Sequence, residues 1–215
     1  ETAVSVEALP ATELSGFRLR AAMSDTLAVA VSQPGSTTDT NRTVDLVRSR
    51  GARVIAIVNR RSSDLTDKSD GVLYTSDGRD VEMSVASAKA FYSQIAAGFL
   101  LTVALADAFG VAPAGDRQAL LAALRDLPEA LEATIATRPA VAAAAQQLAP
   151  HRRYWAIVGN GANRVAAREI RIKPSELCYK SIACDATEDK KHIDLSSEPL
   201  ILVCAAGLEG SNADD

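Results

Sequence analysis

The sequence predicts an α/β protein with two doubly wound parallel sheets, each flanked by helices in three layers, joined by a helical linker. Strand-like and helical segments alternate from residue 26 to residue 108, and the alternation returns after residue 154. The segment "RVIAIVN" (Arg53–Asn59) is β-branched and apolar on both faces, which is typical of a strand covered on both sides. Strands and helices with short connections fold as right-handed crossovers.

The first unit is expected to span residues 1–110. Thr38–Arg50 has the spacing of an amphipathic helix that ends at Gly51, and "SSDLTDKSD" is a short capped helix. We expect a long helix from Ser84 to Ala108. The strands should lie at residues 2–9, 26–31, 53–59 and 71–75.

The linker should span residues 111–153, which are rich in Ala, Leu and Glu, and prolines divide it into two or three helices. A second unit over residues 154–215 should hold strands at 154–161, 181–186 and 199–207 and a helix at 163–180. The chain starts without Met and stops soon after a strand-like segment, so we expect both units to be truncated pieces of something longer.

Composition narrows the classes of function. The chain has 215 residues, of which 47% are hydrophobic and 23% charged, with a net charge of -4. No basic cluster is interleaved with aromatic residues, so nucleic acid is not expected as a partner. Three cysteines at no metal-ligand spacing indicate reduced thiols in a cytoplasm. The apolar segment Ile95–Ala108 is too short to span a bilayer and predicts a buried helix rather than a membrane anchor, and no signal peptide is recognisable.

Residues 32–38, which we call the hydroxyl loop, follow the strand at 26–31 and precede a helix. The loop holds four hydroxyl side chains together with Gln33 and Gly35. Ligands of parallel sheets bind at the carboxyl ends of strands, and the N-terminus of a helix favours an anion. Routine helix capping is the alternative, but one cap explains one hydroxyl. The pattern favours a phosphate cradle without a fixed cation, because no Walker-type lysine follows.

The two glycines of "GNG", at residues 159–161, predict a tight turn between a strand and a helix. The dinucleotide fingerprint needs a third glycine where Arg164 stands, so NAD is discounted. We expect neither a cofactor nor a metal.

Several motifs in order give the chain a family resemblance. "SQPGSTTDT" (residues 32–40) is similar to a Ser-Gln-Ser-Gly-Glu-Thr-x-Asp-Thr loop, and "GARVIAIVN", "SDGVLYT" and "EMSVASAKAFYSQ" follow at matching spacing. Glu169, Lys173, Glu176 and Tyr179 match a Glu-Gly-Ala-Leu-Lys-Leu-Lys-Glu-Ile-Ser-Tyr helix, and His192 matches a Lys-His-Gly-Pro histidine. The chain thus resembles the sugar isomerase (SIS) domains of glutamine–fructose-6-phosphate aminotransferase (isomerizing).

The resemblance implies a hexose 6-phosphate as ligand and an isomerase half that converts fructose 6-phosphate towards glucosamine 6-phosphate. Glu176 would move a proton between C1 and C2, Lys173 would lie near the sugar oxygens, and His192 would assist ring opening from the neighbouring subunit of a homodimer. The implied ligand-binding residues are Ser32, Gln33, Gly35, Ser36, Thr37, Val85 and Ser87.

Residue chemistry agrees with these roles. Aldose–ketose isomerisation needs a carboxylate that shuttles a proton, and a lysine can stabilise the enediolate. Helical spacing puts Glu169, Lys173 and Glu176 on one stripe. The alternative is that Glu169 and Lys173 form an ordinary surface pair and that His192 is a solvated loop residue.

The sequence also departs from the family pattern. Pro34 replaces a serine and removes one hydroxyl and one N–H donor, and Ser36 replaces a glutamate. Pro174 is expected to kink or break the helix directly after Lys173. Without an N-terminal cysteine or glutaminase domain, this chain should not release ammonia from glutamine, although a separate glutaminase domain is possible. The other functions left open are a non-catalytic sugar-phosphate sensor and a deglycase-type relative acting on amino-sugar phosphates.

Overall fold

The computed structural model describes residues 4–77, 87–111, 114–191 and 198–208. The contacts divide the chain into two compact units, Glu1–Leu124 and Arg125–Asp215. Each unit is described by itself.

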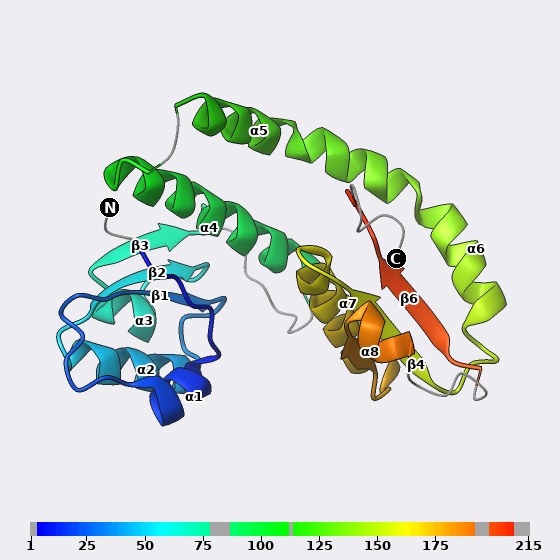
Figure 1. The fold of residues 1–215 in the computed structure, drawn as a ribbon, viewed down its shortest axis with the longest axis horizontal. Helices are drawn as coiled ribbons and strands as arrows, with labels where there is room; N and C mark the ends of the chain where they lie inside the picture. The colour runs from blue at the N-terminus through cyan, green and yellow to red at the C-terminus, as the bar shows by residue number, and fades with distance from the viewer. Residues whose placement is uncertain (1–3, 78–86, 112–113, 192–197, 209–215) are drawn as a thin grey trace. The chain divides into compact units, whose positions relative to one another are not determined.

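The first unit contains a parallel sheet with helices on both of its faces. The strands lie in the order β1-β2-β3, and Ile57 of the central strand is in register with Val31 and Leu73. Figure 1 shows α2 and α3 on one face of the sheet and α4 on the other, which gives the three layers expected from the sequence. The elements are α1 (Ala11–Glu13), η1 (Leu14–Arg18), β1 (Leu27–Ser32), α2 (Thr38–Arg48), β2 (Arg53–Val58), α3 (Asp64–Lys68), β3 (Gly71–Tyr74) and α4 (Ala88–Ala108).

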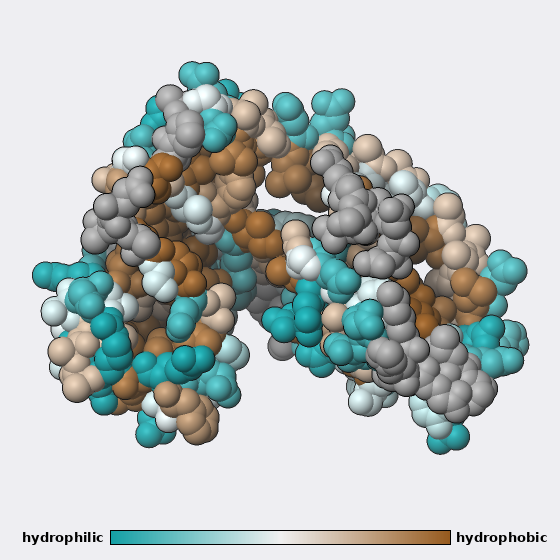
Figure 2. All heavy atoms as spheres, in the orientation of Figure 1, coloured by the Kyte–Doolittle hydropathy of each residue, from teal (hydrophilic) through white to brown (hydrophobic). Residues whose placement is uncertain are grey.

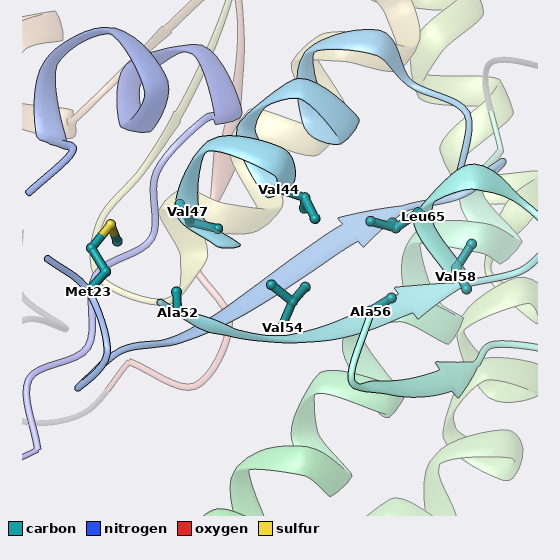
Figure 3. Packing of buried hydrophobic residues seen from close by; sticks show 8 residues of the cluster. All are labelled: Met23, Val44, Val47, Ala52, Val54, Ala56, Val58 and Leu65. Carbon is teal, nitrogen blue, oxygen red and sulfur yellow. The ribbon is translucent and has the colours of Figure 1, made fainter. Parts of the chain in front are cut away.

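The main core of this unit lies between the sheet and the α2 and α3 helices. Because side chains alternate along a strand, Val54, Ala56 and Val58 of β2 point to this face, and all three are fully buried. Ile57 belongs to the opposite face, where Gly98 of α4 approaches its Cδ1 atom. Figure 3 shows the eight buried side chains of the core, which are Met23, Val44, Val47, Ala52, Val54, Ala56, Val58 and Leu65.

The strand predicted for residues 2–9 is wrong over the described residues 4–9, which have no regular secondary structure. A strand is stable only when its N–H and C=O groups pair with a neighbour. Both described sheets are complete without this segment, and no described strand pairs with it. The period-two pattern of "TAVSVEAL" therefore indicates a strand only when a partner is available.

Helix α4 exists as expected, but the prediction that Ile95–Ala108 is buried is wrong in this chain. Only Ala90 and Ala97 of α4 are buried, and Tyr92, Ile95 and Leu100 are nearly half exposed. Apolar side chains are visible on the surface over α4 (Figure 2). By length and composition α4 is the one helix of the described residues that could cross a membrane, which is weak support for a membrane span.

The second unit contains a parallel sheet in the order β5-β4-β6. The chain passes from the central strand to one edge and then crosses back to the other edge, which is the order reversal of a doubly wound sheet. Its buried cluster is small and consists of Ile157, Ala167 and Ile182. The remaining elements are α5 (Ala114–Ala136), which crosses the unit boundary, α6 (Arg138–Leu148), β4 (Trp155–Gly159), α7 (Asn163–Cys178), β5 (Ala183–Asp185), α8 (Thr187–Lys191) and β6 (Leu200–Cys204).

Pro174 does not break α7, so of the kink or break expected after Lys173 the break does not occur. The helix continues through Pro174 to Cys178 and ends where Tyr179 adopts a left-handed conformation, with φ 52°. Proline at position 174 removes the N–H that would pair with the carbonyl of residue 170. Ile170 is 40% exposed, so water can reach this part of the helix and the carbonyl need not stay unsatisfied.

Candidate functional site

The hydroxyl loop lies at the carboxyl end of β1 and leads directly into α2. Gly35 forms its tightest point, with φ +67°, and a Cβ atom there would lie 2.1 Å from Ser63 Oγ and 2.9 Å from Val58 Cγ2. No other residue type fits both the conformation and the space. The loop backbone is thereby pressed against the end of β2 and the start of α3.

The hydroxyl groups of Ser32 and Thr37 face each other across the loop. Their oxygens are 3.0 Å apart, and the Gly35 N–H donates to Ser32 Oγ at 3.2 Å. Thr37 occupies the N-cap position of α2, yet its side chain makes no capping hydrogen bond. The capping alternative therefore does not account for Thr37. The first N–H groups of α2 have no partner within the helix and remain available to an anion.

Asn41, in the first turns of α2, is a loop-forming residue that the sequence reasoning missed. Its side chain is 6% exposed, and Nδ2 donates to the carbonyl oxygens of Gly35 at 3.0 Å and Thr37 at 3.1 Å. The Leu65 N–H also donates to the Gly35 carbonyl, at 3.1 Å. These donors occupy oxygens that would otherwise repel an anion. A polar residue three positions before the core residue Val44 was the available signal.

Gln33 connects the loop to α4. Its carbonyl accepts from the Asn59 N–H at 3.1 Å, and its side-chain Oε1 accepts from Gln94 Nε2 at 3.2 Å. Ser87, which was expected to close the pocket, accepts from the Ala90 N–H at 3.1 Å as the N-cap of α4. Val85 lies outside the described residues. Ser36 is exposed at the rim of the loop.

The second unit holds the residues expected to do acid–base chemistry. Lys173 Nζ and Glu169 Oε1 are 2.7 Å apart, with about a quarter of each side chain exposed. Two members of the expected stripe thus form a partly buried ion pair, as the alternative of an i,i+4 pair foresaw. Glu176 is exposed and forms no ion pair with Lys173 in the described part of the chain. His192 lies outside the described residues.

A separate hollow of about 400 Å³ lies between α7 and β5. Arg168, Arg171 and Ile172 line it from the helix, and Ile182 and Cys184 line it from the strand side. It contains none of the expected site residues. Across the described segments, no group of three His, Cys, Asp or Glu side chains could hold a metal ion.

The fold and the loop together define a class of protein, an α/β domain with a hydroxyl-rich loop between its first parallel strand and the helix that follows. Residues 2–104 match the model of the SIS domain. The chain belongs to the SIS-domain family, as the resemblance implied.

The particular relatives agree with this class. The chain is 36% identical over 180 residues to a glutamine–fructose-6-phosphate aminotransferase (isomerizing) from Symbiobacterium thermophilum, a match that covers 83% of this chain and 29% of that protein. It is 34% identical over 191 residues to the protein of the same name from Halobacterium salinarum, covering 88% of this chain and 30% of that protein. The chain therefore spans about a third of the length of these relatives.

A solved structure shows the same fold. The C-terminal domain of glucosamine-fructose-6-phosphate aminotransferase from Francisella tularensis superposes with a TM-score of 0.77 at 22% identity, covering 85% of this chain and 51% of that one. The predicted fold class, parallel sheets flanked by helices, is confirmed.

Proposed function

We propose that the chain binds a hexose 6-phosphate and carries the isomerising part of an aminotransferase reaction. The observation that carries the proposal is the Ser32–Thr37 hydroxyl pair at the start of α2. The Thr37 hydroxyl makes no capping hydrogen bond to the helix. A phosphate group placed there would accept from these hydroxyls and from the helix N–H groups. Ser36 would add a donor at the rim.

Isomerisation would follow in the second unit. Glu176 would take a proton from C1 or C2 and return it to the other carbon, and its exposure leaves it open to a ligand. Lys173 would stabilise the negative charge of the enediolate, and its pairing with Glu169 would hold the ammonium in place. His192 would protonate the ring oxygen, supplied by the neighbouring subunit of a homodimer. Val85 and Ser87 would complete the sugar pocket.

The proposal includes a setting for this chemistry. The chain would act in the cytoplasm as a domain or partner of a larger enzyme, with a separate glutaminase domain as the source of ammonia. The domains would be residues 1–110 and 154–215 with a linker at 111–153. The partly exposed apolar face of α4 is compatible with a homodimer contact.

The alternative function is a sugar-phosphate sensor that binds without turnover. The observation in its favour is that Lys173 is already neutralised by Glu169 and does not contact Glu176 in the described structure. A sensor needs the hydroxyl loop but not the acid–base residues.

Calorimetric titration with fructose 6-phosphate tests the binding step. Thr37→Ala removes one side of the hydroxyl pair, and we expect it to weaken binding by about tenfold, the loss of a charge-assisted hydrogen bond. Ser49→Ala is the matched control, because it removes an exposed hydroxyl at the other end of α2. An intact chain that does not bind, or equal binding by Thr37→Ala and the intact chain, contradicts the proposed site.

Solvent proton exchange at C1 and C2 of the bound sugar separates the two functions. The isomerase predicts exchange that Glu176→Gln abolishes while binding persists. Saturable binding without exchange in the intact chain identifies the sensor. Exchange that Glu176→Gln leaves unchanged shows that another group is the base.

A further inference from the structure

We infer that Gln94 of α4 is a positioning residue for the hydroxyl loop: it holds the Gln33 side chain so that the amide NH₂ group of Gln33 is presented to the phosphate. The inference rests on the proposed function and names a residue that acts through another. Gln94 itself does not touch the ligand.

The two side chains meet between the loop and α4. Gln94 Nε2 donates to Gln33 Oε1 at 3.2 Å, a contact between residues 61 positions apart in the sequence. The Gln33 backbone is held separately, because its carbonyl accepts from the Asn59 N–H. The side-chain oxygen of Gln33 is therefore held by a donor, and within the described ranges its NH₂ group donates to no other residue.

The chemistry of the ligand makes this orientation matter. A phosphate dianion only accepts hydrogen bonds, whereas a free glutamine amide can turn its oxygen or its NH₂ group towards the ligand. An amide oxygen of Gln33 turned towards the ligand would repel the phosphate. A donor from Gln94 fixes the oxygen on the side of α4 and leaves the NH₂ group for the loop.

The composition of the loop increases the dependence on neutral donors. Residues 32–38 contain no lysine or arginine, and Pro34 has no N–H. Asn41 donates to the backbone carbonyls of Gly35 and Thr37, as Gln94 donates to the side-chain oxygen of Gln33. One amide thus orients the loop backbone, and Gln94 orients the loop side chain.

A double-mutant cycle distinguishes positioning from simple packing of α4. The variants are Gln94→Met, Gln33→Met and the double variant, because methionine keeps the length of glutamine and lacks its hydrogen bonds. Inorganic phosphate and fructose 6-phosphate are titrated separately by calorimetry. We expect Gln94→Met alone to weaken the binding of both ligands about three- to tenfold, the value of one hydrogen bond. In the Gln33→Met background it should have no further effect.

Two more variants sharpen the test. Gln94→Glu offers only acceptors, so it should turn the Gln33 NH₂ group towards α4 and weaken binding more than Gln94→Met. Gln147→Met, an exposed glutamine of α6, is the matched control and should leave binding unchanged.

Each outcome bears on the inference. A Gln94→Met effect of equal size in both backgrounds, or no effect where Gln33→Met weakens binding, overturns the positioning role. The intact chain could bind fructose 6-phosphate no more tightly than inorganic phosphate, while the Gln94 and Gln33 variants still show non-additive effects on phosphate affinity. That result upholds the positioning role and contradicts the proposed sugar ligand. An intact chain that binds neither ligand overturns both.

Discussion

The two units have the same parallel-sheet design but very different cores. The first packs eight buried apolar residues between its sheet and the α2 and α3 helices, whereas the buried cluster of the second has three. On the edge strand β6 of the second unit, Val203 is 63% exposed, although the strand reads as continuously apolar. The difference teaches that an apolar strand pattern specifies a strand, but burial depends on what is available to cover it.

The largest expected effect is the loss of a central isoleucine. Ile57 of β2 and Ile157 of β4 are both essentially inaccessible and both lie on the middle strand of their sheet. Truncation to alanine should cost about 2–5 kcal/mol at each site, from lost burial and the cavity left behind. We expect Ile57→Ala to cost more, because α4 covers the face of the sheet to which Ile57 points and limits collapse of the cavity.

Denaturant unfolding of the two variants measures this comparison. Leu208→Ala, at a partly exposed residue, is the control and should change the free energy of unfolding little. A larger loss for Ile157→Ala than for Ile57→Ala would contradict the view that the central strand of the first unit is the more tightly packed of the two.

A second comparison concerns two glycines in left-handed conformations. Gly35 in the first unit has φ +67° and no room for a Cβ atom, and Gly161 in the second has φ +55° and open space around it. Gly161→Ala should cost about 1–2 kcal/mol for the backbone conformation alone. Gly35→Ala must also displace Ser63, so it should cost more and should abolish phosphate binding.

Thermal unfolding and phosphate titration check both variants. Equal destabilisation by Gly35→Ala and Gly161→Ala would show that the loop moves away from Ser63 without strain. In that case the tight packing of the hydroxyl loop is not required for its shape.

Two asparagines provide a third, smaller comparison. Asn41 is buried and donates twice to loop carbonyls, whereas Asn163 at the start of α7 exchanges hydrogen bonds with Ala206 in an exposed position. Asn41→Asp loses both side-chain donations and places a carboxylate in a buried position, and we expect it to cost about 1–3 kcal/mol. Asn163→Asp keeps its acceptor and gains from the helix dipole, so its cost should stay below about 1 kcal/mol.

The free energy of unfolding and the affinity for phosphate are measured for both asparagine variants. Asn41→Asp should weaken phosphate binding, since the added negative charge repels an anion. Unchanged phosphate affinity in Asn41→Asp would contradict a role for Asn41 in the site.

The smallest expected effect is a pH dependence at the surface of the first unit. Hydrogen bonds from Arg20, with Thr26 as second donor, lower the pKa of Asp25 from 3.8 to about 2. Because the folded-state pKa lies below the unfolded value, the pair stabilises the fold above pH 3.8, and its contribution is lost as the pH falls through about 2. The pair is exposed, so salt should weaken it.

A carboxyl-carbon NMR titration follows Asp25 directly. Arg20→Ala should return the pKa of Asp25 towards 3.8, and Arg18→Ala, two residues away, should leave it lowered. A lowered pKa that persists in Arg20→Ala would assign the shift to the Thr26 hydroxyl or the backbone instead.

The sequence alone predicted most of the elements and the loop, for reasons that are local. Apolar periodicity identified β1, β2 and α2. The hydroxyl residues after Val31 predicted a phosphate-binding loop, which stays a prediction. The same reasoning failed at residues 4–9, where a strand needs a partner. At Pro174 the helix continues without the break that the sequence allowed.

The amide contacts of the candidate site were beyond the reach of sequence reasoning. Gln94 meets Gln33 only because α4 packs on the sheet, and Asn41 reaches Gly35 only because the loop folds back over α2. Sequence by itself determined which segments become strands and helices and where hydroxyl groups gather, since backbone preferences and short-range periodicity act between near neighbours. Tertiary structure alone decided which face of each element is covered and which amide orients which donor, because those depend on contacts between residues far apart in the chain.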